Sequence, residues 1–308
     1  MFGRAVFLLL VVLVLGAGVF WVVTTPVTVS AAALPPYSPS LANGEAVFNE
    51  GGCASCHAPA DQPRTVLSGG LALPSPFGTF YAPNISPHPT DGLGNWTEAN
   101  FVTALTKGTS PAGDHYFPAF PYASYQRATV QDLRDLFAFL KTLPPVAGRA
   151  RDHDLKFPFS IRRLVGGWKF LFFDGKPFAP ASQKSPQWNR GAYLVTSLGH
   201  CAECHSPRNL LGGIIASQRF AGGPNPEGEG WVPNITQKGL KDWSEKDVSY
   251  FLETGELPDG DSVGGSMAKV IKNTSRLSEQ DRTAMAVYVK SLPPVEGPPK
   301  PPKKAPST

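Results

Sequence analysis

The longest apolar run of the 308-residue chain lies at its N-terminus. Ala5 to Val23 comprises 19 residues without a charged or strongly polar side chain, and Arg4 precedes it. A helix of about 20 apolar residues crosses a hydrocarbon core, whereas the core of a signal peptide has about 7–15. The run therefore predicts a transmembrane helix, and Arg4 on its short side predicts that the remainder of the chain lies outside. The alternative is a signal sequence that is cleaved after the small residues 31–33.

Beyond residue 40, apolar residues recur at helical spacing between helix start and stop signals. Leu133, Leu136 and Leu140 form one apolar face, and a Pro-Pro pair ends their segment. Ser or Thr followed by a first-turn carboxylate marks four N-termini, and Gly follows two of these segments. Helices are predicted for residues 43–49, 97–108, 130–142, 190–197, 244–255 and 279–291.

The second half of the chain repeats the first at an offset near 148 residues. Residues 83–86 (PNIS) correspond to 233–236 (PNIT), and residues 143–146 (LPPV) correspond to 292–295. Each half therefore carries the same unit. The predicted domains are a membrane anchor or signal segment with its tether at 1–39, a first unit at 40–146, a linker at 147–188, a second unit at 189–295 and a disordered Pro- and Lys-rich tail at 296–308.

Each unit contains the most specific chemical motif of the sequence, Cys-x-x-Cys-His. Residues 53–57 read CASCH and residues 201–205 read CAECH, so the two motifs use all four cysteines. This is the attachment signature of c-type haem, in which two thiols bond to the ring and the adjacent imidazole binds the iron. A thioredoxin-like pair has no need of the histidine twice, and a zinc site split over such a distance would be unusual. The predicted ligands of two covalently bound haem c groups are Cys53, Cys56, Cys201 and Cys204, with His57 and His205 as the proximal iron ligands.

Composition and charge narrow the prediction further. With 31 Gly and 32 Pro, the chain is typical of a loop-rich protein around a large cofactor rather than of a regular sheet. A net charge of +4 is too small to indicate nucleic-acid binding. Covalent haem attachment takes place outside the cytoplasm, so the motifs predict export. The fold class that follows is all-α, with two tandem cytochrome c domains behind an N-terminal transmembrane helix.

The two units differ where a second axial ligand is expected. Met267 lies on a predicted loop before the last helix, and it is the predicted sixth ligand of the second haem, because a thioether opposite imidazole stabilises ferrous iron. The first unit has Phe120 at the corresponding position, and phenylalanine cannot bind iron. His115, five residues upstream, is the nearest candidate ligand. The alternatives are that His115 only hydrogen-bonds locally and that the first haem is five-coordinate.

Two further stretches carry hypotheses. Aromatic and arginine residues are dense in the linker, which is predicted to wrap the surface between the units; the alternative is a docking face for a partner. Arg208, just after the second motif, is a candidate partner of a haem propionate.

Together these motifs resemble a known family. Residues 77–85 (FGTFYAPNI), 117–122 (FPAFPY) and 199–209 (GHCAECHSPRN) are similar to segments of bacterial di-haem cytochromes c and of the cytochrome subunits of membrane-bound alcohol and gluconate dehydrogenases. The resemblance covers about residues 40 to 295. The chain departs from those subunits in having two haem motifs instead of three, and Phe120 where they have methionine.

The resemblance implies an electron-transfer subunit rather than a catalyst on its own. It would take single electrons from a periplasmic dehydrogenase and pass them to a cytochrome, an oxidase or a quinone-linked acceptor of the respiratory chain. Its place would be the periplasmic side of the bacterial inner membrane, with no nucleic acid among its partners. The alternative is a haem enzyme with an open first haem, either peroxidase-like or thiosulfate-oxidising.

Overall fold

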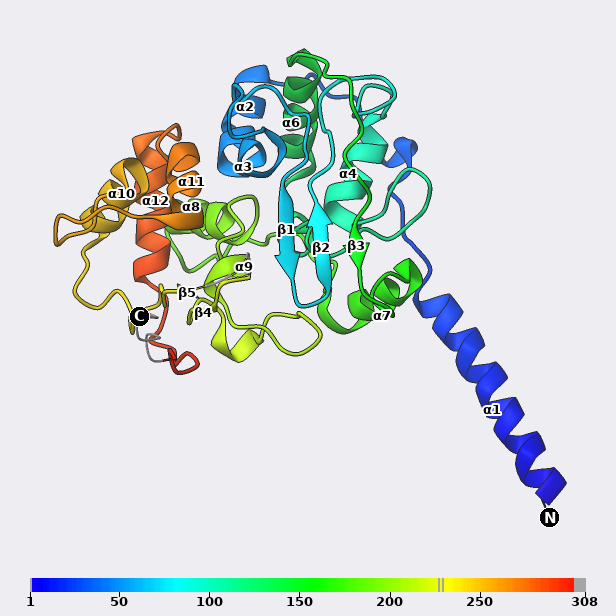
Figure 1. Ribbon diagram of the computed structural model, residues 1–308. Helices are drawn as coiled ribbons and strands as arrows, with labels where there is room; N and C mark the ends of the chain where they lie inside the picture. Colours follow the sequence, from blue (N-terminus) through cyan, green and yellow to red (C-terminus); the bar gives the residue numbers. More distant parts are fainter. Residues whose placement is uncertain (1, 227, 229, 302–308) are drawn as a thin grey trace, which may run out of the picture.

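One helix stands apart from the rest of the chain. In the computed structural model, which describes residues 2–226, 228 and 230–301, helix α1 (Phe2–Val23) projects from the body and has no buried residue (Figure 1). With 22 residues and a hydropathy of 3.0, it is long and apolar enough to cross a membrane. The predicted apolar helix is thus present, and it could serve as a membrane anchor.

Two similar sets of helices follow α1 in the order that the repeat predicts. The first set is α2 (Leu41–Glu50), α3 (Cys53–His57), α4 (Glu98–Lys107), α5 (Tyr122–Tyr125) and α6 (Val130–Thr142). The second set is α8 (Pro186–Thr196), α9 (Ala202–His205), α10 (Glu245–Thr254), α11 (Gly265–Thr274) and α12 (Glu279–Lys290). Helix α7 (Arg162–Phe172) lies between the sets, and short 3-10 turns occur at Ala31–Ala33 and Ala216–Gln218.

The expected capping residues begin and end these helices. The side chains of Thr97 and Ser244 accept the backbone N–H three residues on and complete capping boxes at the starts of α4 and α10. Both helices end at a glycine in the left-handed conformation, Gly108 at φ 58° and Gly255 at φ 78°. Helices α6 and α12 are capped by a hydroxyl in the same manner.

The first and last long helices of each set cross at a glycine. A Cβ on Gly44 of α2 would lie 2.2 Å from the carbonyl oxygen of Asp135 in α6. A Cβ on Gly191 of α8 would lie 1.8 Å from the carbonyl oxygen of Ala284 in α12. Only glycine allows two backbones to approach this closely. The same close crossing therefore holds both sets together.

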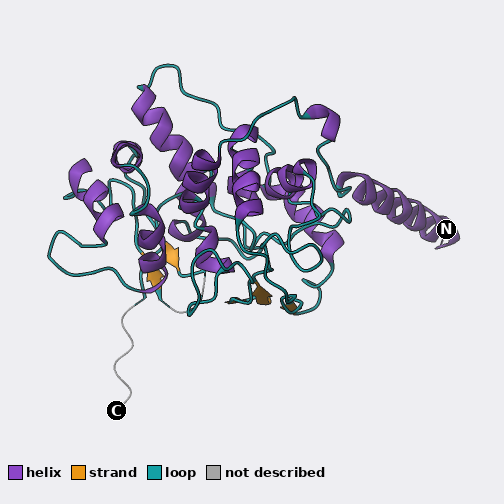
Figure 2. Ribbon diagram, turned by 90° about the horizontal axis from the view of Figure 1, so that it is seen from above, coloured by secondary structure: helices purple, strands orange, loops and turns teal. Residues whose placement is uncertain are grey.

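Short strands accompany the helices, so the prediction of an all-α chain is not confirmed. Strand β2 (Gly78–Tyr81) pairs antiparallel with β1 (Ala72–Ser75) and with β3 (Asp154–Leu155), and β4 (Gly223–Pro224) pairs antiparallel with β5 (Trp231–Val232). These strands are short beside the helices, and most lie among loops (Figure 2). Across the described residues, the fold is helix-rich with little sheet.

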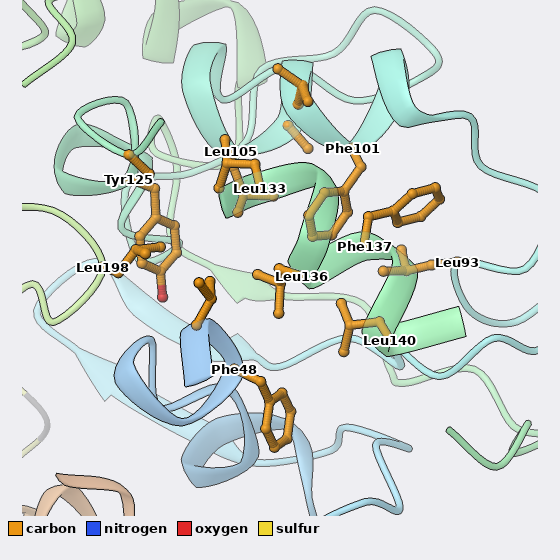
Figure 3. Packing of buried hydrophobic residues seen from close by; sticks show 14 of the residues in the cluster. Phe48, Leu93, Phe101, Leu105, Tyr125, Leu133, Leu136, Phe137, Leu140 and Leu198 are labelled. Atoms are coloured by element: carbon orange, nitrogen blue, oxygen red, sulfur yellow. The ribbon is translucent and has the colours of Figure 1, made fainter. Parts of the chain in front are cut away.

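Buried side chains form two main cores, one for each set of helices. The first core is centred on α4 and α6, with Leu133, Leu136 and Phe101 among its members (Figure 3). The second is centred on α8, α10 and α12 and includes Met285, as expected for a methionine inside a helix. Leu198, which follows α8 in sequence, is 1% exposed and belongs to the first core. The two sets are therefore packed against each other at this point.

The linker packs against the body, as its aromatic residues predicted, and the first residues of the tail make contacts as well. Helix α7 occupies part of the linker and buries Val165 and Gly166 against the first unit. In the tail, Glu296 pairs with Lys238 at 2.6 Å, and its carbonyl oxygen accepts from the Gln218 side chain. Residues 302–308, the larger part of the predicted disordered tail, lie outside the described residues.

Candidate haem-attachment sites

The two Cys-x-x-Cys-His motifs form equivalent short helices. Helix α3 contains the whole first motif, and α9 contains the second from Ala202 to His205, with Cys201 as its N-cap. A residue with positive φ precedes each motif, Gly52 at 61° and His200 at 38°. All four cysteines are half-buried thiols rather than disulfides. In each site one turn of helix thus gathers two thiols and an imidazole, as the haem prediction requires.

A backbone carbonyl orients the histidine of each motif. His57 Nδ1 lies 2.7 Å from the Pro83 carbonyl oxygen, and His205 Nδ1 lies 2.8 Å from that of Pro233. A carbonyl oxygen only accepts, so Nδ1 carries the proton and Nε2 keeps its lone pair. Burial lowers the pKa of both histidines, which favours the same neutral imidazole. Metal-binding histidines have this arrangement in general, because the second hydrogen bond fixes the tautomer and the ring orientation.

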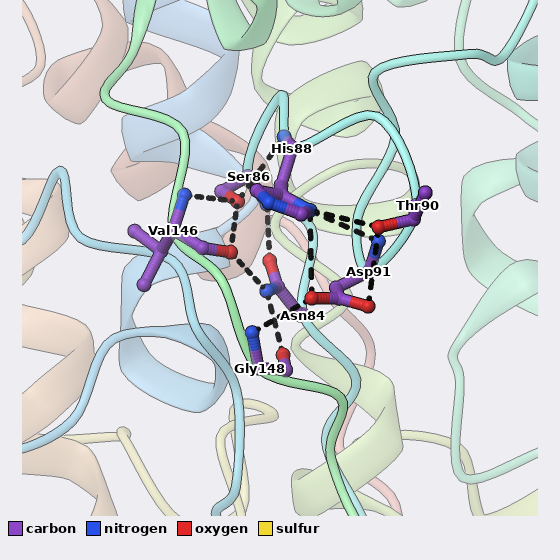
Figure 4. A network of polar contacts seen from close by, with 7 residues as sticks. All are labelled: Asn84, Ser86, His88, Thr90, Asp91, Val146 and Gly148. Carbon is purple, nitrogen blue, oxygen red and sulfur yellow. Dashed lines mark hydrogen bonds and ion pairs between the residues drawn. The ribbon is translucent and has the colours of Figure 1, made fainter.

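The Pro-Asn-Ile-Ser/Thr segment that supplies the carbonyl is tied to the chain after the last helix of its unit (Figure 4). In the first unit the Asn84 amide donates to the carbonyl oxygens of Val146 at 2.7 Å and Gly148 at 2.9 Å. Its Oδ1 accepts from the Ser86 N–H at 2.9 Å, and Ser86 Oγ accepts from the Val146 N–H at 3.0 Å. We call this set of hydrogen bonds around Asn84 the asparagine bracket. It ties the segment that begins at Pro83 to the chain after α6, and so holds the Pro83 carbonyl in place.

The second unit has the same asparagine bracket. The Asn234 amide donates to the Val295 carbonyl oxygen at 2.8 Å, and its Oδ1 accepts from the Thr236 N–H at 2.8 Å. The repeat in the sequence showed these residues, but it did not show that they position the haem-motif histidines. The signal was the place of the proline in each repeat, since Pro83 follows His57 by 26 residues and Pro233 follows His205 by 28.

A glycine with positive φ brings each carbonyl segment close to its motif. The Gly69 N–H donates to the His57 carbonyl oxygen, and the Gly222 N–H donates to that of His205, both at 2.8 Å. A Cβ on Gly69 would lie 2.5 Å from the Pro83 carbonyl oxygen, and one on Gly222 would lie 2.6 Å from that of Val232. Both backbones have φ near 75°, at 76° and 74°. These positions require glycine for both conformation and space.

Met267 lies in the first turn of α11, so the prediction that it is a loop residue was wrong. The helix was missed because Gly264 and Gly265, poor helix formers, begin it and no side chain caps it. The half-buried Met267 side chain packs against the second core, as Cys201 of the second motif also does. Its thioether thus shares a hydrophobic cluster with the haem motif of the same unit.

The structure gives His115 partners that leave it no lone pair for iron. It is 4% exposed, and its Nε2 lies 2.8 Å from the Thr24 carbonyl oxygen, to which it donates. Its Nδ1 accepts from the Lys169 ammonium at 3.0 Å. Both ring nitrogens are therefore engaged, at the junction of the α1 end with α7. These contacts favour the alternative of local hydrogen bonding, and iron ligation by His115 stays a prediction.

Phe120 lies in the half of the structure that holds the first motif. It packs against the first core, as Cys53 does, and contacts a set of tyrosine rings. The ring-centroid distances are 5.6 Å to Tyr116, 6.2 Å to Tyr122 and 5.7 Å to Tyr125. The position that the sequence aligns with Met267 is thus filled by an aromatic cluster without a thioether.

Tyr125 links the surroundings of the two motifs. Its hydroxyl donates to the Gly51 carbonyl oxygen at 3.4 Å, and its ring lies 5.6 Å from that of His200, next to the second motif. Burial, with the nearby Cys53 and Glu203, raises its pKa well above the usual value. Sequence reasoning missed this residue, because it follows an unremarkable tyrosine-rich turn.

Polar contacts join each motif to the other unit. Ser124 donates to Glu203 Oε1 at 2.7 Å, and Arg208 Nη2 donates to Glu203 Oε2 at 2.6 Å. On the other side, Asn273 Nδ2 donates to Ser55 Oγ at 2.8 Å, and Arg64 donates to Asn273 Oδ1 at 2.7 Å. The Arg208 guanidinium is thus paired with a carboxylate of its own motif, and its pairing with a haem propionate stays a prediction.

The residues present fit two c-type haems. Each site combines two thiols, an imidazole with its tautomer fixed by a carbonyl, and apolar side chains from one core. This donor set is that of proteins that hold haem covalently. The chain belongs to the cytochrome c family, which matches residues 41–144 and 189–293. It carries two covalently bound haem c groups.

Individual relatives share most of the chain. A diheme cytochrome c-type protein of Cereibacter sphaeroides is 48% identical over 291 residues, 94% of this chain and 97% of its own length. The fructose dehydrogenase cytochrome subunit of Gluconobacter japonicus is 37% identical over 83% of this chain, and the cytochrome c subunit of the quinone alcohol dehydrogenase of Gluconacetobacter polyoxogenes is 38% identical over 82%. The chain spans 53% and 56% of the length of these two subunits.

Proposed function

We propose that this protein is the electron-transfer subunit of a membrane-bound dehydrogenase. It receives single electrons from the dehydrogenase partner in the periplasm and passes them through two haems to an acceptor of the respiratory chain. The observation that carries the proposal is the pair of equivalent haem sites, each hydrogen-bonded to the other unit, in a chain similar to cytochrome subunits of fructose and alcohol dehydrogenases. The acceptor is a cytochrome, an oxidase or a quinone-linked enzyme.

In this proposal the cysteines and histidines of the two motifs hold the haems, and Met267 closes the second iron. The haems supply reversible one-electron chemistry at their irons when bound. The chain fixes their separation, excludes water and sets each potential by ligand and burial. The imidazole that donates its hydrogen bond to the carbonyl oxygen of Pro83 or Pro233 stays neutral, and its ring orientation stays fixed. Tyr125 and His200 fill the space between the two motifs with a direct ring contact.

The first haem has no thioether ligand in this proposal. Residues 40–146 contain no methionine, and His115 has both ring nitrogens engaged. Without sulfur to stabilise ferrous iron, the first haem has the lower potential of the two. Electrons from the partner therefore enter at the first haem and leave from the second.

We place helices α2 to α12 on the periplasmic side of the membrane, with α1 as a retained anchor. Arg4 lies on the short side of α1, and the haem motifs require attachment outside the cytoplasm. The domain limits proposed from the repeat, 40–146 and 189–295, leave the linker and α7 next to the end of α1.

The partner is tested by mild detergent extraction from native membranes. We expect the chain to be recovered with an oxidoreductase, and the substrate of that oxidoreductase to reduce both haems in the complex. Alcohols, fructose and gluconate are the first substrates to supply, because the names of the relatives include them. Recovery with no oxidoreductase would contradict the dehydrogenase role.

Carbon monoxide separates this function from that of a haem enzyme. The reduced protein is expected to bind about one carbon monoxide per chain, at the haem without sulfur, and the Met267→Leu variant about two. A peroxidase or a thiosulfate-oxidising enzyme would in addition turn over its substrate at the first haem. Electron transfer without such turnover supports the proposal, and turnover of peroxide or thiosulfate by the purified chain contradicts it.

A further inference from the structure

Helix α7 exposes an apolar face. Leu164, Phe170 and Leu171 are all exposed, Phe170 at 70% and Leu171 at 60%. The segment before the helix continues this surface with exposed Phe157 and Ile161. A helix that faces water presents polar residues on its outer side, so these side chains indicate a surface that another phase or molecule covers.

This surface lies at the outer end of the anchor helix (Figure 1). The Arg163 guanidinium sits 4.1 Å from the centroid of the Trp21 ring and donates to the Trp21 carbonyl oxygen. A Cβ on Gly167 would lie 3.7 Å from the Phe20 ring. Helix α7 therefore packs against the last turn of α1, where a spanning helix leaves the hydrocarbon core. Tryptophan is enriched at that depth of a membrane.

The second unit extends the same surface. The Trp168 indole N–H donates to the Leu211 carbonyl oxygen at 3.0 Å, which fixes the 210–211 loop beside α7. Leu210 at the tip of this loop is 96% exposed. Residues from the linker and from the second unit thus form one apolar surface at the end of α1.

The charge of α7 favours a lipid surface over a protein as the occupant. The helix has three basic residues and no acidic one, and Arg162 is exposed at its rim. The Lys169 ammonium is turned inward onto the carbonyl oxygens of Lys107 and Gly108, so the arginines supply the outward charge. An amphipathic helix with basic residues and exposed Phe and Leu lies in the plane of a membrane that contains anionic lipid. Continuity with α1 fixes its height, because a helix that contacts Trp21 cannot stand away from the membrane that α1 spans.

We propose that α7, the 157–161 segment and the 210–211 loop lie in the outer headgroup layer of the membrane, as a second attachment to anionic lipid. The inference rests on the proposed retention of α1 as an anchor. A single spanning helix with a tether leaves the body free to tilt, whereas this second contact sets the height and tilt of both haem units above the bilayer.

The test is lipid photo-crosslinking of the full holo-protein in nanodiscs of phosphatidylcholine and phosphatidylglycerol. Benzoylphenylalanine is placed in turn at Val12, Phe170, Leu210 and the exposed control Tyr250 of α10. Because an interfacial helix buries its apolar face by about 5–10 Å, we expect about fivefold more lipid adduct at 170 and 210 than at 250. Adducts at 12 but not at 170 or 210 would overturn this inference alone. No adduct at 12 would overturn the anchor itself.

Two further measurements test the effect of this surface on haem orientation and the alternative that a protein, rather than lipid, covers it. In oriented multilayers, the Phe170→Glu/Leu171→Glu double variant is expected to spread the haem orientations seen by electron paramagnetic resonance about twofold, because charge drives the helix out of the headgroup layer. The Tyr250→Glu control, with equal haem content, leaves the spread unchanged. An unchanged spread in the double variant overturns the proposal, as does crosslinking of position 170 to a protein in native membranes.

Discussion

At the scale of single residues, the hydrogen bond between each haem-motif histidine and a proline carbonyl is the contact expected to influence the reduction potential of each haem most directly. It makes the imidazole a better electron donor to the metal, which favours ferric iron and lowers the potential. The glycines at 69 and 222 allow that carbonyl to approach. A substitution there changes the bond without touching a haem ligand.

Gly69→Ala is expected to raise the potential of the first haem. The added Cβ would lie 2.5 Å from the Pro83 carbonyl oxygen and push it away from His57. A hydrogen bond of ~1 kcal/mol corresponds to roughly 40 mV for one electron. Spectroelectrochemical titration measures the shift. Gly70→Ala is the control, since Gly70 also has positive φ but nothing within 4 Å of a Cβ. Equal shifts in both variants would assign the effect to backbone strain.

Glu50 predicts a pH dependence of stability. Burial raises the pKa of its carboxyl well above the ordinary value, and the nearby Arg190 only partly opposes this. The folded state therefore holds the proton more tightly than the unfolded chain. Its stabilising contribution is complete below the unfolded pKa of about 4.5 and is lost as the pH rises through the raised value. Glu50→Gln should melt above the wild type at pH 8 and close to it at pH 4.5. A constant difference across this range would contradict the assignment.

Met267→Leu tests the proposed sulfur ligand. Leucine preserves the packing against the second core but cannot bind iron. The potential of the second haem is expected to fall toward or below that of the first, as Met ligation raises it. Met285→Leu, in the middle of α12, is the matched control and should leave both potentials in place. If neither variant moves a potential, Met267 is not the ligand.

At the scale of helices and strands, the sequence predicted the elements whose signals are local. Caps at Thr97 and Ser244 and the apolar spacing of α6 and α12 placed the main helices within a few residues. The signals failed for α7, which contains Gly166 and Gly167 in its middle, and for α11, which starts at two glycines. Packing decides those helices, and packing is not visible in a single sequence.

The helix crossing at Gly44 predicts a loss of stability on the smallest substitution. Gly44→Ala places a Cβ 2.2 Å from the Asp135 carbonyl oxygen and forces α2 and α6 apart. Overpacking of this kind costs about 1–3 kcal/mol, which outweighs the helix propensity gained by alanine. Gly167→Ala in α7, with only one ring atom at 3.7 Å, is the control and should be neutral or mildly stabilising. Denaturant unfolding of both variants measures the difference.

At the scale of the whole molecule, the haem motifs and the repeat were readable, but the junctions between units were not. His115 looked like a candidate ligand because its partners, Thr24 and Lys169, are distant in sequence. The contacts of Asn273 with Ser55 and Arg64 also join the units. They left no signal in the sequence, because these partners are likewise distant along the chain. Spacing predicts chemistry within one unit, whereas the arrangement of units depends on such long-range pairs.

Asn273→Ala is expected to loosen the junction between units. It removes hydrogen bonds to Ser55 and Arg64, each worth about 1 kcal/mol, and leaves the buried side of Arg64 without that partner. Hydrogen exchange of α3 and of α11 should rise together by roughly thirtyfold, the effect of the ~2 kcal/mol that the two bonds contribute. Asn209→Ala, whose contacts with Leu211 and Gly213 lie within the second unit, should leave α3 unchanged. Exchange that rises only in α11 would show that the junction does not depend on this residue.

The presence of Leu198 in the first hydrophobic core has a consequence for the order of folding. When the ribosome has completed α6, that core still lacks a side chain that lies 56 residues further along the chain. At about 5–20 residues per second, the gap lasts roughly 3–11 seconds. The first core therefore gains its full set of buried side chains only after synthesis of the second half has begun. Packing of the first core is completed when the segment just before the second motif has been synthesised, so folding of the first half is coupled to synthesis of the second.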